Sequence, residues 1–172
     1  MKLLKKTSKI AEIIGSLGIV VSLIFVAIQY EKNSVALKTS TANSVNSNIA
    51  NWYSSIADNS NTSKTLIRFL ENPEGVSTSE RFQAIMKLHS LNLHLQNAFY
   101  LEKNEVLDSS LRKSITMAIY SGLNQPGFYF FWNIRKGTYT DEYRDFVEGI
   151  IASERNQTLE KLFEKKVSSK DS

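Results

Sequence analysis

The chain has 172 residues, of which 42% are hydrophobic and 22% charged, with seven Gly, two Pro and no Cys. This length suits a single domain, and the absence of Cys excludes a disulfide scaffold, a Cys-ligated metal site and thiol catalysis. Gly and Pro are too scarce for collagen, for low-complexity disorder or for a many-stranded barrel.

The net charge of +4 comes from the N-terminus rather than from the chain as a whole. Four lysines precede residue 10, and Glu12 is the only acidic residue near them. From residue 31 onward, basic and acidic residues nearly balance. A nucleic-acid-binding protein carries its positive charge on the folded domain, so we expect no nucleic-acid partner.

Residues 1–9 form a basic tail, and residues 10–30 are predicted to cross a lipid bilayer as a single transmembrane helix. The run between Glu12 and Glu31 is uncharged and almost wholly apolar, close to the length of about 20 residues that a spanning helix needs. Lysine side chains before it and Tyr30 at its end suit the two membrane interfaces.

Two other interpretations of this segment stay open. A cleavable signal peptide has an apolar core of about 7–15 residues and small residues at its cleavage site, whereas Phe25, Val26 and Ile28 fill that place here. The core helix of a soluble domain would be apolar on one face, and this segment is apolar on every face. Both therefore fit less well than a retained anchor.

Small residues recur along one face of the predicted membrane helix at spacings of three and four. They are Ala11, Gly15, Gly18 and Ser22. Small residues let two membrane helices approach closely, which would give a homo-oligomer or a complex with another membrane protein. The alternative is that membrane helices are generally rich in Gly, Ala and Ser.

A continuous helix is predicted from Lys9 to about Ala57, roughly 70 Å long at 1.5 Å per residue. Its second half carries one apolar stripe with helical spacing. The stripe consists of Ala42, Val45, Ile49, Trp52 and Ile56. We expect it to pack against later helices of the same chain rather than in a parallel coiled coil, because Lys38 occupies a seam position.

The rest of the chain is predicted to be all-α, with about five further helices forming a bundle domain over residues 31–166 and a flexible tail over 167–172. Helix starts are predicted from capping residues and from one proline: Ser63, Ser77 or Thr78 followed by Glu80, Asp108, Pro126 and Thr140. The helix that ends near Lys103 has two apolar stripes, one with Phe82 and Leu93 and one with Leu88 and Leu95. Such a helix belongs at the centre of a bundle.

No nucleophile and base can be paired, and phosphate-loop, dinucleotide-binding and zinc-protease motifs are missing from the sequence. The only histidines, His89 and His94, point about 140° apart on a helix and cannot chelate one metal ion. We therefore expect no enzyme activity, no metal and no cofactor. One polar cluster remains in the predicted core: His89, Gln96, Asn97 and Tyr100. It is either a hydrogen-bonded structural network or the pocket of a small-ligand sensor.

Three segments together resemble a group of uncharacterised bacterial single-pass membrane proteins with an N-terminal transmembrane helix and a short all-helical domain. The first segment is residues 22–33 running into 36–38, and the second is residues 96–100 followed by 106–108. The third is residues 126–128 and 131–132, then 143–147. The resemblance implies architecture and no activity. This sequence departs from the group at one point. The resembling proteins usually have a more arginine-rich segment directly after the membrane helix, where this chain has Glu31, Lys32 and Lys38.

Function is thus predicted to be that of a membrane-anchored, non-enzymatic interaction module in the cytoplasmic (inner) membrane. Lys2, Lys5, Lys6 and Lys9 precede the span, against Lys32 and Lys38 shortly after it. The positive-inside rule then keeps the N-terminus in the cytoplasm and puts the domain on the extracytoplasmic side. The arginine-rich flank of the resembling proteins favours the opposite side. We weigh the lysines of this chain more heavily, because the insertion machinery acts on this chain and not on its relatives.

Overall fold

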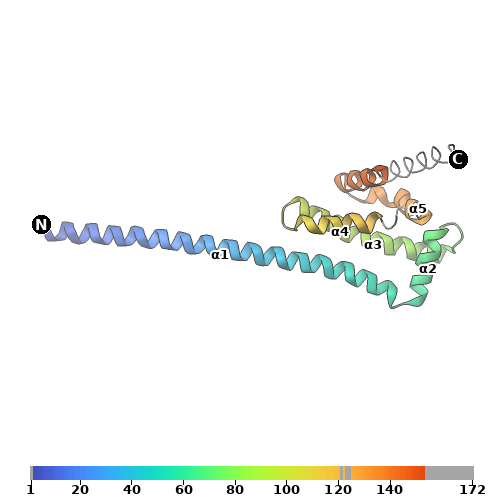
Figure 1. The fold of residues 1–172 in the computed structure, drawn as a ribbon, viewed down its shortest axis with the longest axis horizontal. Helices are drawn as coiled ribbons and strands as arrows, with labels where there is room; N and C mark the ends of the chain where they lie inside the picture. The colour runs from blue at the N-terminus through green and yellow to red at the C-terminus, as the bar shows by residue number, and fades with distance from the viewer. Residues whose placement is uncertain (1, 121, 123–124, 154–172) are drawn as a thin grey trace, which may run out of the picture. The chain divides into compact units, whose positions relative to one another are not determined.

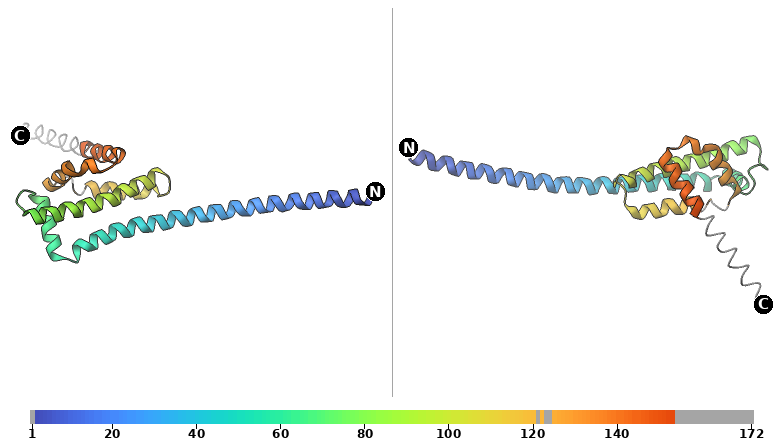
Figure 2. Two further views of the ribbon diagram at one scale, coloured as in Figure 1. Left: turned by 180° about the vertical axis from the view of Figure 1, so that it is seen from behind. Right: turned by 90° about the horizontal axis from the view of Figure 1, so that it is seen from above.

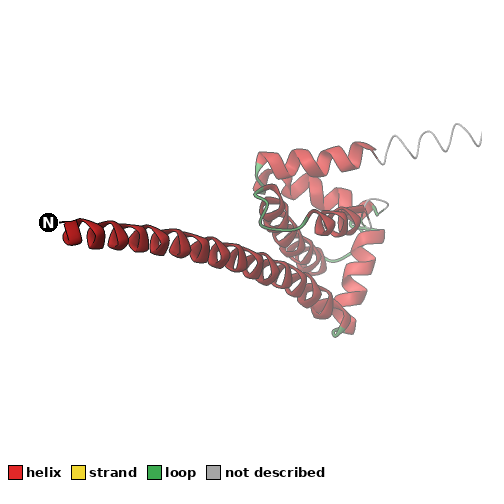
Figure 3. Cartoon of the chain, turned by 60° about the vertical axis from the view of Figure 1, so that its left-hand side comes forward, coloured by secondary structure: helices red, strands yellow, loops and turns green. Residues whose placement is uncertain are grey.

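The computed structural model describes residues 2–120, 122 and 125–153, and every regular element among them is helical (Figure 3). The elements in chain order are α1 (Lys2–Ala57), α2 (Ser60–Glu71), α3 (Thr78–Lys103), α4 (Ser109–Tyr120), α5 (Pro126–Arg135), the short 3-10 helix η1 (Lys136–Thr138) and a helix over 141–153 (Figure 1). The all-α prediction is confirmed.

The chain divides into two compact units between Thr41 and Ala42, later than the predicted domain start at residue 31. The reason lies in side-chain burial along α1. Val35 is 60% exposed, whereas Val45 is 4% exposed and belongs to the core of the second unit. The predicted end of the bundle at residue 166 and the tail over 167–172 lie outside the described residues.

One helix among the described residues is a candidate membrane span, and it is α1, which runs from the first unit into the second. Over Ile14–Ala57 the helix is long and apolar enough to cross a membrane, and its most apolar stretch has a mean hydropathy of 1.8 with no part of it buried. The core helix of a soluble protein would be mostly buried. Within this stretch the Ser22 hydroxyl donates to the Gly18 carbonyl oxygen at 2.8 Å, so a polar group is satisfied inside the helix.

The apolar stripe at the end of α1 packs against the core of the second unit, as predicted. Two hydrogen bonds add to this packing. The Trp52 indole donates to the backbone carbonyl of Lys87 at 2.7 Å, and the Lys87 ammonium donates to the Ser55 hydroxyl at 2.9 Å. Since the stripe is used within the chain, it is not the seam of a coiled coil.

Most helix starts follow from local capping chemistry. Ser77 and Glu80 form a reciprocal capping box at α3, and the Asp108 carboxylate accepts from the backbone N–H of Ser110 at 2.7 Å. The prediction that Ser63 caps α2 is wrong, because Asn59 is the cap and accepts from two backbone N–H groups at 3.0 Å. The Ser63 hydroxyl instead donates to the Ile56 carbonyl at 2.6 Å, which ties α2 to the end of α1.

Helix α3 lies at the centre of the second unit and packs against α2, α4 and α5, as the two views in Figure 2 also show. Its buried residues are Ala84, Leu88, Leu91, Asn92, Leu95 and Ala98. One of its two predicted apolar stripes therefore lies in the core. The other does not, because Phe82 is 65% exposed and Leu93 is also exposed. Residues 139–140 cover part of this side through His89, Gln96 and Tyr100, and they leave Phe82 and Leu93 exposed.

Helices α2 and α5 approach so closely that only glycine fits at position 127. A Cβ atom there would lie 2.6 Å from the Leu70 Cα and closer still to the Phe69 carbonyl oxygen. Both obstacles are backbone atoms, which cannot move away without shifting the helix.

We expect Gly127→Ala to destabilise the domain by about 1–3 kcal/mol, since a methyl group overpacks this contact. Gly149→Ala is the matched control, because no atom lies within 4 Å of its added Cβ and alanine favours a helix. Urea unfolding of the full chain in lipid nanodiscs, followed by tryptophan fluorescence, measures both changes. Equal stability of the two variants would contradict the close packing.

Candidate functional site

A row of four polar side chains runs along one face of α3 and holds the segment 139–143. The four residues, spaced by three or four, are His89, Asn92, Gln96 and Tyr100. The Tyr143 hydroxyl donates to the Asn92 amide oxygen at 3.2 Å, His89 Nδ1 lies 2.8 Å from the Tyr139 hydroxyl, the Thr140 backbone N–H donates to the Gln96 amide oxygen at 3.0 Å, and the Tyr100 hydroxyl donates to the Thr140 hydroxyl at 2.8 Å. We call this set the α3 polar row.

Aromatic packing surrounds the row on the side of the last described helix. Trp132 stacks on Tyr139 with ring centroids 5.5 Å apart, and Tyr139 meets Tyr143 edge-on at 5.7 Å. Burial raises the pKa of both tyrosine hydroxyls, so they stay protonated and remain hydrogen-bond donors. These donors match the acceptors that Asn92 and neutral His89 offer.

Burial, and to a lesser degree the positive charge of Arg135, lowers the pKa of His89 below its usual value of about 6.5. The ring is therefore neutral at physiological pH. With Nε2 protonated, Nδ1 accepts a hydrogen bond from the Tyr139 hydroxyl. A protonated ring would lose this acceptor and would add a positive charge beside Arg135.

Of the four residues predicted to form a polar cluster, the structure brings three together. His89, Gln96 and Tyr100 all contact residues 139–140, whereas Asn97 is exposed on another side of α3. Sequence reasoning missed Asn92, although an amide between Leu88, Leu91 and Leu95 was a signal for a buried hydrogen bond. The geometry favours a structural network over a ligand pocket at these residues.

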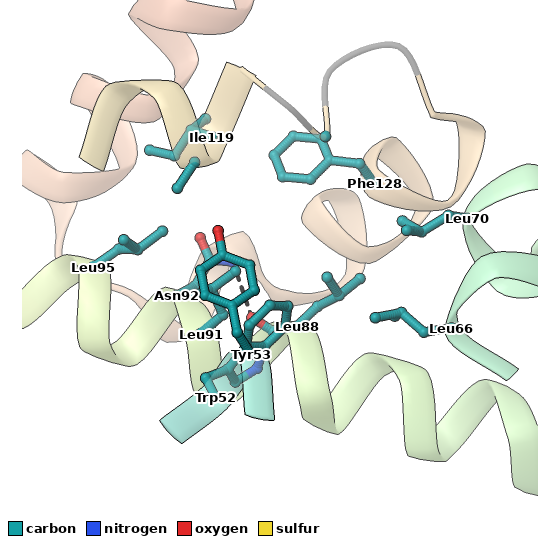
Figure 4. Close-up of a pocket in the computed structure, with 12 residues that line it drawn as sticks. Trp52, Tyr53, Leu66, Leu70, Leu88, Leu91, Asn92, Leu95, Ile119 and Phe128 are labelled. Carbon is teal, nitrogen blue, oxygen red and sulfur yellow. Dashed lines mark hydrogen bonds between the residues drawn. The ribbon is translucent and has the colours of Figure 1, made fainter. Parts of the chain in front are cut away.

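A cavity does lie in the core of the second unit, and a different set of residues lines it (Figure 4). Its volume is about 140 Å³, and α1, α2, α3, α4 and α5 all contribute to its walls. Only Asn92 belongs both to the α3 polar row and to these walls. We call this cavity the core pocket.

The aromatic residues at the start of α5 belong to the core. Phe128, Phe131 and Trp132 are each buried, so their faces are not open to nucleobases or sugars. Within the described part of the chain, no group of three His, Asp or Glu side chains is arranged to hold a metal ion. Comparisons of the chain with protein-family models, with curated proteins and with solved structures give no match.

Acid should destabilise the domain through His89. Because its pKa is lower when folded than when unfolded, the unfolded chain binds more protons, and stability falls as pH drops below about 6.5. His89→Gln keeps an acceptor for Tyr139 without titrating, so we expect a flatter stability profile between pH 7 and about pH 5. Thermal unfolding across that range is the measurement.

The matched control is His94→Gln, at the only other histidine in the chain. It should retain the loss of stability in acid. If both variants keep the slope of the unmodified protein, His89 is not its source.

Proposed function

We propose that this protein is a membrane-anchored, non-enzymatic helical interaction module with a single transmembrane helix. The observation that carries the proposal is the exposed apolar stretch of α1, which belongs to a different unit from the packed helices. Its large side chains from Ile14 to Val26 are all apolar and exposed, which suits lipid and does not suit water. We propose that this helix remains in the mature protein as an anchor, whereas a signal peptide would be cleaved off.

The proposed location is the cytoplasmic membrane of a bacterium, with the domain outside the cytoplasm. The lysine excess before the span supports this orientation, and the resemblance to bacterial single-pass proteins supports the location. A partner would contact the outer surface of the helical domain or the membrane helix itself.

A dual reporter tests the anchor and its orientation together. With alkaline phosphatase, which folds only outside the cytoplasm, fused to the C-terminus, we expect activity in the membrane fraction and a fusion of full uncleaved mass. A fusion to green fluorescent protein should stay dark when exported by the Sec route. Fluorescence would overturn the orientation, and a shortened or soluble product would overturn the anchor.

Homo-oligomerisation through the small-residue face of the membrane helix is the second part of the proposal. A Cβ added at Gly15 or Gly18 meets no atom within 4 Å, so this face is open along the helix. The N-terminal member Ala11 lies among residues whose side chains are not described. Two such faces could approach closely within the bilayer.

Leucine at both glycines should abolish such an association. We expect Gly15→Leu combined with Gly18→Leu to reduce crosslinking between copies in membranes by about tenfold, since bulk keeps the helices apart. Val20→Leu, on the opposite side of the helix, is the matched control and should leave crosslinking unchanged. Equal crosslinking in all three proteins would exclude this face as the interface.

A further inference from the structure

We infer that the core pocket binds a small apolar molecule consisting of a single aromatic ring with one hydroxyl group. This inference concerns the second unit alone and does not depend on the proposed function. Native cores contain few voids larger than a water molecule. A volume of about 140 Å³ is therefore unusual, and it matches the size of cavities that accept one benzene ring.

The walls of the pocket are largely apolar and come from helices α1 to α5. Leu66 and Leu70 belong to α2, Leu88 and Leu95 to α3, Ile119 to α4 and Phe128 to α5 (Figure 4). None of the described residues that line it is charged. A phosphorylated or ionised ligand would lose its hydration without gaining a partner, so these classes are excluded.

Three aromatic side chains favour a ring over a linear chain. Trp52, Tyr53 and Phe128 all line the pocket, and aromatic pairs gain from edge-on or offset contacts. Tyr53 is 51% exposed although it lines the pocket, which locates an opening beside it. In Figure 4 its ring stands across the pocket, with the hydroxyl on the side of Ile119.

Two polar groups provide hydrogen bonds for a hydroxyl. Asn92 is 2% exposed, and it donates to the Leu88 carbonyl at 3.0 Å while accepting from Tyr143. A primary amide has two N–H groups and two lone pairs on its oxygen, so one of each is left for a ligand. The Tyr53 hydroxyl is the second group. The variant Tyr53→Phe removes this hydroxyl and keeps the aromatic ring.

The two tryptophans of the chain can report on ligand binding, Trp52 as the probe of the pocket and Trp132 as the reference. Trp52 lines the pocket, whereas Trp132 is buried against Tyr139 and does not line it. In the full chain labelled with 5-fluorotryptophan, in nanodiscs of dimyristoyl phosphatidylcholine, each residue gives one fluorine resonance. The variant Trp132→Phe assigns them.

With phenol as the probe, we expect the Trp52 resonance to shift and saturate with a dissociation constant of about 1 mM or lower. The Trp132 resonance should stay in place. Ala118→Leu adds bulk to the α4 wall of the pocket and should weaken binding by at least about tenfold. Tyr53→Phe should weaken phenol by about threefold to tenfold and leave toluene unchanged, since only phenol uses the hydroxyl.

Three results would overturn the inference. The first is a Trp52 shift that stays linear in phenol and is equal in Ala118→Leu, which reports partition into the bilayer. The second is a Trp52 resonance that does not shift when phenol is added but does shift when dioleoyl lipid replaces dimyristoyl lipid. This result identifies a lipid acyl chain as the occupant of the pocket. The third is equal weakening of phenol and toluene by Tyr53→Phe, and this result decides the question if Ala118→Leu fails to fold.

Discussion

The hydrogen bond between Tyr143 and Asn92 fixes how the last described helix joins α3. Tyr143 is fully buried and Asn92 nearly so, and either group left unpaired there would cost the desolvation of a polar atom. A shift of the segment 139–143 by one residue would break this bond and the others of the α3 polar row together. The stack of Trp132 on Tyr139 depends on the same register. Polar groups thus specify an arrangement that apolar packing alone would leave less defined.

Local signals made part of this fold predictable from the sequence. The capping box of Ser77 with Glu80, and Pro126 at the start of α5, are decided by residues within one turn of the helix end. At the start of α2 two capping residues compete. Asn59 caps the helix, whereas the Ser63 hydroxyl, which was equally suitable by sequence, donates to the Ile56 carbonyl instead. The exposure of Phe82 was not predictable, because it depends on which sides of α3 other helices cover. Asn92 was missed for a related reason, since its partner Tyr143 lies far away along the chain.

Helix α1 carries two patterns of apolar residues along one continuous helix. Up to Val26 its apolar residues occupy every face, and from Ala42 they narrow to one stripe with Ser, Thr and Asn on the other faces. The first pattern suits a surrounding apolar phase, and the second suits one protein contact with water elsewhere. Val35 and Val45 are the same residue in the same helix, yet their burial differs because only the second belongs to the stripe that packs. Pattern rather than composition therefore separates the two units.

The core pocket lies beside the close contact between α2 and α5. Leu70 lines the pocket, and the backbone of the same residue approaches Gly127 so closely that a single methyl group does not fit. The void is therefore not a sign of loose packing between α2 and α5. Two of the side chains that line it are held by hydrogen bonds: Asn92 by Leu88 and Tyr143, and Trp52 by the Lys87 carbonyl. Since hydrogen bonds already fix these two side chains, a ligand that contacts them costs little conformational entropy at Asn92 and Trp52.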